Sequence, residues 1–166
     1  MLLNGKVWKF EDNISTDLIA PGRLFHLRSN LPELAKHVME DARLGFSNMI
    51  SKGDFIVAGE NFGLGSSREH APTIIKMSGI DAVLAKSFAR IFYRNSINIG
   101  LPAIICDTSK LNEGDELEID IIKGIVLDKT TNFKLTFPSF PPIMNKILME
   151  GGLVPYIKKY GMLKTD

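Results

Sequence analysis

The sequence predicts an α/β fold with a mixed β-sheet, and two patterns support this. Between residues 55 and 106, short apolar runs typical of strands alternate with segments typical of helices. That order is characteristic of parallel strands with helices packed on the sheet. Residues 116–120 and 134–137 instead alternate apolar and polar side chains, as peripheral antiparallel strands do. A chain of 166 residues can bury a real core, and we expect one domain over residues 1–166.

The first part of the chain predicts a strand, two loops and a helix. Residues 5–10 alternate and indicate the first strand, and residues 11–17 are rich in Asp, Asn and Ser, which favour a loop. We expect a second loop over residues 22–31. A helix over residues 32–41 should follow, because Pro32 suits a first helical turn.

The centre of the chain predicts strands connected by helices. The expected elements, in order, are a strand over 55–59, a glycine turn over 60–65, a helix over 66–79 ended by Gly79, a strand over 82–85, a short helical or irregular stretch over 88–99, and a strand over 103–106. After the prolines of 138–142, residues 143–150 predict a terminal amphipathic helix that stops at Gly151.

Charge and composition argue against several kinds of partner. Lys plus Arg (20) nearly balance Asp plus Glu (19), so no global field favours nucleic acid or an anionic membrane. The start of the chain does not look like a signal peptide, and no apolar run approaches the ~20 residues of a membrane span. We therefore expect a cytoplasmic protein. Arg90 and Arg94 lie among aromatic residues, but the helical spacing of Phe88 and Phe92 favours packing, with the arginines pairing locally or at a subunit interface.

Metal binding by this chain is not expected. Cys106 is the single cysteine and lies in an apolar run, whereas an iron–sulfur cluster usually takes three or four thiolates. The three histidines, His26, His37 and His70, are far apart and lack the spacing of zinc ligands.

Residues 61–71, Asn-Phe-Gly-Leu-Gly-Ser-Ser-Arg-Glu-His-Ala, carry the clearest chemical signal. Glycines allow positive φ and close approach of a ligand. Free amides at a helix N-terminus favour an anion, and Arg68 can hold a carboxylate with two parallel hydrogen bonds. A structural alternative is that Ser66 and Ser67 cap the helix while Arg68 and Glu69 form a solvated pair. The residues by themselves indicate an anion site that suits a carboxylate.

The complete segment resembles the serine loop of the aconitase superfamily, specifically the small subunits of the two-subunit isopropylmalate isomerases and homoaconitases. Further stretches resemble that family in the same order: residues 5–10, Thr16-Asp17 with Pro21, 57–59, 61–72, 86–95, 97–102 and 151–156. Two departures stand out. Leu64 occupies a position that is commonly cysteine, and Ser15-Thr16-Asp17 stands where relatives often have Asp-Thr-Asp.

The resemblance implies a fold and a partner. The fold is a three-layer, swivelling β/β/α domain like the fourth domain of aconitase. It closes over a large subunit that carries a [4Fe-4S] cluster, in a heterodimer or heterotetramer, and this chain binds no cofactor. Neither subunit is then competent as a hydro-lyase without the other.

The resemblance also implies roles for the serine loop, residues 61–72. Ser66 is the expected catalytic base, acting as an alkoxide on the carbon next to a carboxylate, and Arg68 the expected clamp for a substrate carboxylate. Ser67 would donate to the backbone or to the substrate. Four residues are expected to support the loop: Gly63, Gly65, Glu69 and His70. For His70, a place in the proton network and a structural role both stay open.

The substrate is expected to be a small di- or tricarboxylate hydroxy acid, selected by the loop over residues 22–31. Leu27-Arg28-Ser29 resembles the Leu-Arg-Thr loop of homoaconitase-like subunits, in which the arginine meets a third carboxylate. Isomerisation of 2- and 3-isopropylmalate, a step of leucine biosynthesis, is the first expectation. Homoaconitate, dimethylmalate or citramalate, and a broad-specificity enzyme are alternatives. An anion-binding regulatory module and a pure scaffold are the non-enzymatic ones.

Overall fold

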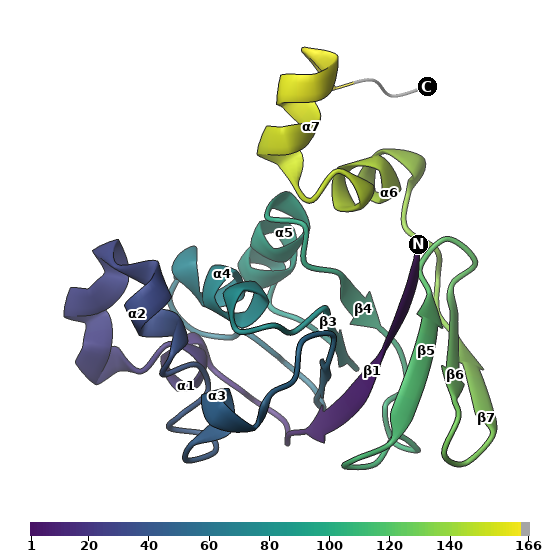
Figure 1. The fold of residues 1–166 in the computed structure, drawn as a ribbon, viewed down its shortest axis with the longest axis horizontal. Coiled ribbons are helices and arrows are strands. Elements are labelled where there is room, and N and C mark those ends of the chain that lie inside the picture. The colour runs from purple at the N-terminus through teal and green to yellow at the C-terminus, as the bar shows by residue number, and fades with distance from the viewer. Residues whose placement is uncertain (164–166) are drawn as a thin grey trace.

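The computed structural model describes residues 1–163, and its centre is a seven-stranded sheet of order β4-β3-β2-β1-β5-β6-β7 (Figure 1). The strands are β1 (Leu2–Lys9), β2 (Phe55–Val57), β3 (Ala82–Ala85), β4 (Ala103–Ile105), β5 (Glu116–Asp120), β6 (Ile125–Asp128) and β7 (Phe133–Thr136). Strands β1 to β4 pair in parallel, and β5 to β7 are antiparallel. Strand β1 joins the two halves, because it pairs in parallel with β2 and antiparallel with β5.

Short helices connect the strands. They are α1 (Thr16–Ile19), the 3-10 helix η1 (Gly22–Ser29), α2 (Leu31–Ala35), α3 (Phe46–Met49), α4 (His70–Met77), α5 (Arg90–Asn98), α6 (Pro142–Met149) and α7 (Leu153–Tyr160). Helix α4 links β2 to β3 and α5 links β3 to β4, as expected for parallel neighbours.

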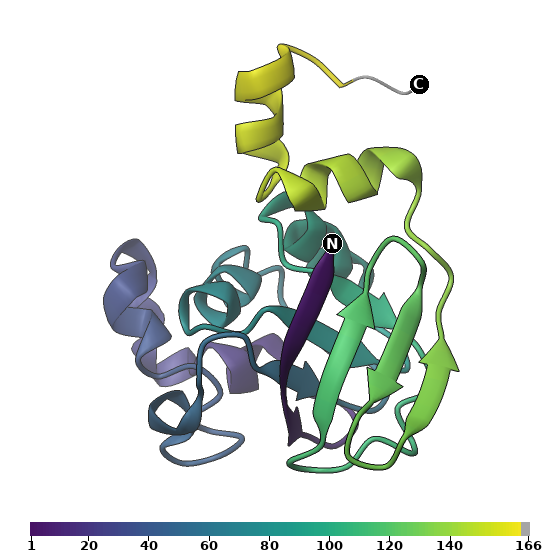
Figure 2. The ribbon, with the colours of Figure 1, turned by 45° about the vertical axis from the view of Figure 1, so that its right-hand side comes forward.

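The sheet curls so that its antiparallel half covers one face of its parallel half, which gives three layers of β, β and α (Figure 2). Alternate residues of the parallel strands serve two cores. Ile56 and Val83 face the helical side with Ile74 of α4. On the other face lie, among others, Phe55, Leu84, Leu117 of β5, Val126 of β6, Ile147 of α6 and Tyr156 of α7. The mixed α/β class and the β/β/α layering are thus confirmed.

Several boundaries expected from the sequence are wrong. The helix expected over 66–79 is α4, which begins only at His70, because the chain before it makes a tight turn in which the Arg68 amide donates to the Ser66 carbonyl. The helix expected over 32–41 is α2 followed by turns, and Met39 has φ +56°, which no α-helix accommodates. Gly79, with φ +106°, lies just after α4 as expected.

Four helices, α1, η1, α3 and α7, lie where the sequence predicted none. The loop expected over 22–31 is largely the 3-10 helix η1. Helix α1 begins within the stretch 11–17 that was expected to be loop, and its Leu18 amide donates to the Ser15 hydroxyl. Helix α7, after the Gly151-Gly152 stop, extends away from the body of the molecule (Figure 1). None of the helices within residues 1–163 has the length and apolar character needed to cross a bilayer.

Candidate functional site

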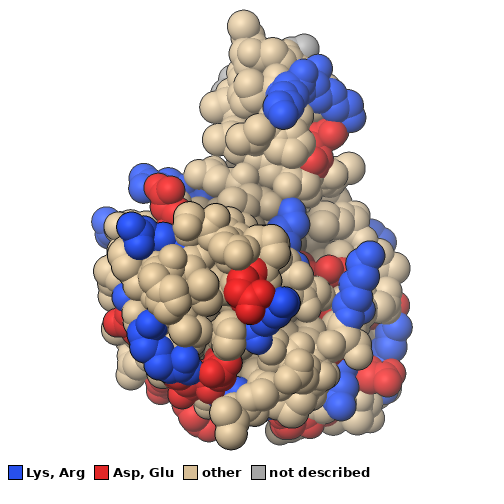
Figure 3. All heavy atoms as spheres, turned by 60° about the vertical axis from the view of Figure 1, so that its left-hand side comes forward, with Lys and Arg blue, Asp and Glu red and all other residues tan. Residues whose placement is uncertain are grey.

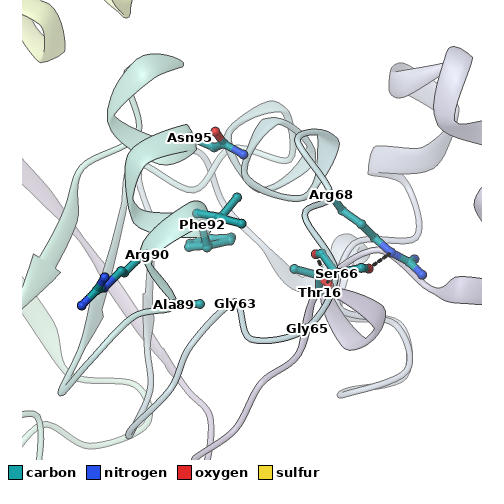
Figure 4. A pocket seen from close by; sticks show the side chains of 10 residues that line it. Thr16, Gly63, Gly65, Ser66, Arg68, Ala89, Arg90, Phe92 and Asn95 are labelled. Carbon is teal, nitrogen blue, oxygen red and sulfur yellow. Dashed lines mark hydrogen bonds between the residues drawn. The ribbon is translucent and has the colours of Figure 1, made fainter.

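A cavity of about 390 Å³ lies beyond the carboxyl ends of the parallel strands, where segments that follow β1, β2 and β3 meet. Parallel sheets commonly bind ligands at this edge. Its lining residues are Thr16, Gly63, Gly65, Ser66, Arg68, Ala89, Arg90, Ile91, Phe92 and Asn95. Figure 4 shows Ser66 and Arg68 on one side of the hollow and the residues of α5 on the other.

Main-chain hydrogen bonds hold the serine loop against the segment that follows β1. The Gly63 amide donates to the Ile14 carbonyl at 2.7 Å, and the Thr16 amide donates to the Leu64 carbonyl at 2.8 Å. The Thr16 hydroxyl, which is buried, also donates to the Ser66 carbonyl at 3.0 Å. The position of Ser66 therefore depends on a segment about fifty residues earlier in the chain.

The two glycines of the turn, Gly63 and Gly65, are required by different constraints. Gly63 has φ +80°, and a Cβ there would overlap the Phe92 side chain, so both conformation and space exclude other residues. Gly65 has φ +106°, and a Cβ would lie 3.3 Å from the Thr16 hydroxyl, so conformation is the stronger constraint.

Arg68 is the best-anchored polar side chain of the site, and only 15% of it is exposed. Its Nη1 donates to the Ala20 carbonyl at 2.9 Å, its Nη2 pairs with the Asp17 carboxylate, and its Nε donates to the Ser66 hydroxyl at 3.2 Å (Figure 4). The guanidinium thus places positive charge directly beside that hydroxyl, which itself is exposed to the cavity. Charge in this position stabilises a deprotonated oxygen more than a neutral one.

The other expected residues of the loop lie outside the cavity lining. Ser67 and Glu69 are exposed, and Glu69 is the N-cap position of α4 without a side-chain cap. His70 begins α4, with its ring centroid 6.3 Å from that of Phe25. Burial lowers the pKa of His70, and the charges of Arg68 and Arg28 lower it further.

Arg28 is not brought to the cavity. Its guanidinium carbon lies 4.4 Å from the Phe25 ring centroid, and its Nη1 donates to the Phe25 carbonyl at 3.2 Å. The same ring lies 5.6 Å from the guanidinium carbon of Arg68. Phe25, 47% exposed, therefore lies next to both of the arginines that were expected to bind carboxylates.

Several residues of the site were not predicted to belong to it. Thr16, Asp17 and Phe92 lay in stretches noted for resemblance or packing, and no residue pattern announced that they would meet Ser66. Asp17 could be found only from the folded chain, since it lies far from Arg68 in the sequence.

The described residues offer no metal centre. Within residues 1–163 no three His, Cys, Asp or Glu side chains gather as a metal ion would require. Burial raises the pKa of the Cys106 thiol to about 12, which disfavours the thiolate that an iron ligand must supply.

Comparison with known proteins identifies the family. Residues 49–107 match the model of the aconitase C-terminal domain. The 3-isopropylmalate dehydratase small subunit 2 of Archaeoglobus fulgidus is 59% identical over 99% of this chain and 99% of its own length. The small subunit 1 of the same enzyme from Thermotoga maritima is 58% identical, over 96% of this chain and 97% of its own.

A solved structure agrees with these relatives. The crystal structure of 3-isopropylmalate dehydratase from Methanocaldococcus jannaschii superposes with a TM-score of 0.91 at 45% identity, covering 97% of this chain and 96% of that one. At such identity and coverage, the chain belongs to the family of 3-isopropylmalate dehydratase small subunits, which share the aconitase C-terminal domain.

Proposed function

We propose that this chain is the small subunit of a 3-isopropylmalate dehydratase, in which Ser66 is the base and Arg68 binds a substrate carboxylate. The relatives named above carry that enzyme name, and the similarity covers 99% and 97% of their length. The observation that supports the roles is the 3.2 Å hydrogen bond from Arg68 Nε to the Ser66 hydroxyl at the edge of an open cavity.

A serine hydroxyl is a weak base, so its environment has to stabilise the alkoxide. Arg68 supplies positive charge at hydrogen-bond distance, and its contacts with Asp17 and Ala20 hold the guanidinium in place. The N–H groups of Arg68 that these contacts leave free are available to a substrate carboxylate.

The reaction is an elimination followed by an addition. The Ser66 alkoxide takes a proton from the carbon next to a carboxylate, and the electron pair left behind forms a double bond to the neighbouring carbon. The hydroxyl of that carbon leaves as water by taking a proton from an acidic group of the assembled enzyme, and that group regains a proton when water adds back. Adding water back with the opposite orientation gives the isomer and returns the proton from Ser66.

Departure of the hydroxyl is also helped by a Lewis acid. Within residues 1–163 no three His, Cys, Asp or Glu side chains gather to hold a metal ion that could act as one. From the resemblance to the family, we expect a [4Fe-4S] cluster on the large subunit to supply this Lewis acid. The name small subunit carried by the relatives implies such a larger partner.

The contacts of Arg28 favour isopropylmalate over a tricarboxylate. Its guanidinium already stacks on Phe25 and donates to the Phe25 carbonyl. A third carboxylate would have to displace these contacts, whereas the isopropyl group only requires an apolar surface such as the exposed part of the Phe25 ring. Homoaconitate is the second candidate, because Arg28 is exposed on the same helix η1.

The test is reconstitution with the large subunit under anaerobic conditions, followed by the ultraviolet absorbance of the unsaturated intermediate. Ser66→Ala should lower kcat by about 10²–10⁴-fold, the usual contribution of a positioned base. Ser67→Ala, at the neighbouring residue, is the matched control and should lower kcat far less. A Ser66→Ala complex that turns over at the wild-type rate would falsify the catalytic role.

Substrate ranking completes the test. Rates on isopropylmalate, homoaconitate and citraconate should fall in an order led by isopropylmalate. A faster rate on homoaconitate would assign Arg28 to a third carboxylate instead.

A further inference from the structure

One face of α5 borders the cavity and is open to solvent. Arg90 and Ile91 line the cavity, and Ile91 is 43% exposed, a large fraction for an isoleucine in a packed helix. Arg94 is also exposed and follows Arg90 by four residues, so the two arginines lie on the same side of the helix, beside Ile91.

The two arginines of this face are unusual in this protein. The others have partners: Arg23 pairs with Glu40 and Asp41, Arg43 with Glu113, Arg68 with Asp17, and Arg28 with Phe25. Within residues 1–163, the side chains of Arg90 and Arg94 make no hydrogen bond, ion pair or ring contact. Figure 4 shows the Arg90 side chain pointing away from Ser66, so it does not serve the hydroxyl.

Helix α5 is fixed relative to the serine loop. The Ala89 amide donates to the Phe62 carbonyl at 2.9 Å, and the Phe62 and Phe92 rings pack edge to face at 5.2 Å. Gly63 leaves no room between the turn and Phe92. A partner that docks on α5 is therefore held at a defined position relative to Ser66.

We propose that the Arg90, Ile91 and Arg94 face of α5 is a docking surface for an acidic patch on the large subunit. This rests on the proposed function, which requires a large subunit to meet the cavity that this face borders. Guanidinium groups bind carboxylates with two parallel hydrogen bonds and are enriched in interfaces, and Ile91 supplies an apolar centre between them. The complementary surface is thus acidic around an apolar contact.

Other occupants fit this face less well. Basic and acidic side chains are interspersed on the side of the molecule seen in Figure 3, and over the whole chain Lys plus Arg (20) nearly balance Asp plus Glu (19). Charge therefore gives no general reason to expect a nucleic acid. The aromatic Phe92 is buried and so cannot stack on bases. A second copy docked through the same patch about a two-fold axis would bring arginines against arginines.

The experiment measures the affinity of the intact chain for the large subunit by anaerobic titration calorimetry at two salt concentrations. Arg94 is the position of choice because it does not line the cavity. Arg94→Glu should weaken association about tenfold or more and reduce its salt dependence, as loss of charge complementarity does. At saturating large subunit, kcat should stay at the wild-type value.

Lys134→Glu is the matched control, since Lys134 is an exposed cation on β7, the strand at the other end of the sheet from β4. It should bind like the wild type. Arg94→Gln, which removes the charge alone, should fall between the two, and thermal unfolding checks that each variant is folded.

The possible results separate the two proposals. If the wild type associates and Arg94→Glu binds equally well, the docking surface is refuted and the proposed function stands. If the wild type does not associate with the large subunit, the proposed function fails and the docking surface with it. If Arg94→Glu instead changes the sedimentation of the isolated chain while its affinity for the large subunit is unchanged, the face binds a second copy and the inference is wrong.

Discussion

The Thr16 hydroxyl donates a 3.0 Å hydrogen bond to the main-chain carbonyl of Ser66. The Thr16 amide donates to Leu64, so one residue holds the serine loop at two points. Ser15 makes an isolated parallel bridge to Leu64 beside it. Because Ser66 carries the proposed chemistry, Thr16 is a positioning residue whose loss should affect rate more than folding.

Replacing Thr16 by Val tests that role, since valine keeps the shape and removes the hydroxyl. The variant should lose about 1 kcal/mol of unfolding free energy, the usual net value of one hydrogen bond. Its kcat should fall roughly tenfold to hundredfold, because a small displacement of a reacting group is costly. Urea unfolding and steady-state rates of the reconstituted complex measure the two effects.

Thr108→Val is the matched control for this substitution. Thr108 is also buried and donates to a main-chain carbonyl, that of Ala58, at 2.7 Å, but it does not line the cavity. The Thr108→Val variant should lose a similar amount of unfolding free energy while its kcat stays unchanged. If both variants lose kcat equally, the effect of Thr16→Val comes from general destabilisation.

Gly63→Ala should be strongly destabilising for two reasons. A non-glycine residue at φ +80° lowers the unfolding free energy by about 1–2 kcal/mol. The added methyl group also overlaps the Phe92 side chain, and overpacking of this kind costs about 1–3 kcal/mol more. Gly45→Ala separates the two terms, since Gly45 has φ +70° and a Cβ there would have no neighbouring atom within 4 Å. Unfolding in urea should show a much larger loss for Gly63→Ala, and equal losses would mean that Phe92 moves aside freely.

Much of the fold could be predicted because local pattern and final structure agree. The apolar run at residues 82–85 is β3, and the alternating run at 116–120 is β5, with the boundaries expected. The helix over 32–41 failed because Met39 adopts positive φ, a conformation imposed by packing of its fully buried side chain rather than by its own preference. Local propensity carries no information of that kind.

The site could be predicted only in part, for a similar reason. The glycines, serines and arginine of residues 63–68 are neighbours in sequence, so their grouping was visible. The contacts of Arg68 with Asp17 and Ala20 join segments 48 or more residues apart and depend on the sheet order that places β1 beside β2. Arg28 illustrates the opposite case. Its sequence context suggested a carboxylate-binding residue, but in the folded chain its guanidinium stacks on the Phe25 ring and donates to the Phe25 carbonyl.

His70 should make the stability of the chain sensitive to mildly acidic pH. Burial, with Arg68 and Arg28, lowers its pKa in the folded state below the ordinary value of 6.5. Below that pH the unfolded chain therefore binds a proton that the folded chain does not, so the unfolding free energy decreases as pH falls. His70→Gln should show a smaller decrease than the wild type between about pH 7 and 5.5, a range around the unperturbed histidine pKa.

A second variant tests the cause of the shift. Arg28→Gln removes one of the charges that lower the pKa of His70, so the pKa followed by NMR titration should rise. An unchanged titration would mean that burial and the charge of Arg68 account for the lowered pKa without Arg28.

Phe25→Ala should shift substrate preference toward a third carboxylate. The ring centroid lies 4.4 Å from the guanidinium carbon of Arg28 and 5.6 Å from that of Arg68. An exposed cation–π contact contributes about 0.5–1 kcal/mol, so its loss should change the ratio of kcat/KM for homoaconitate over isopropylmalate by about two- to fivefold. Removing the apolar surface of the ring should also lower kcat/KM for isopropylmalate, which shifts the ratio further toward homoaconitate.

His26→Ala is the control for this last substitution, because His26 is the next residue on η1 and is exposed like Phe25. It should leave the ratio unchanged, which separates the ring of Phe25 from a general loosening of the helix. Phe25→Leu retains apolar surface without the aromatic face and should give an intermediate ratio. If Phe25→Ala changes kcat/KM for both substrates by the same factor, the ring supports the shape of η1 and does not select between an isopropyl group and a carboxylate.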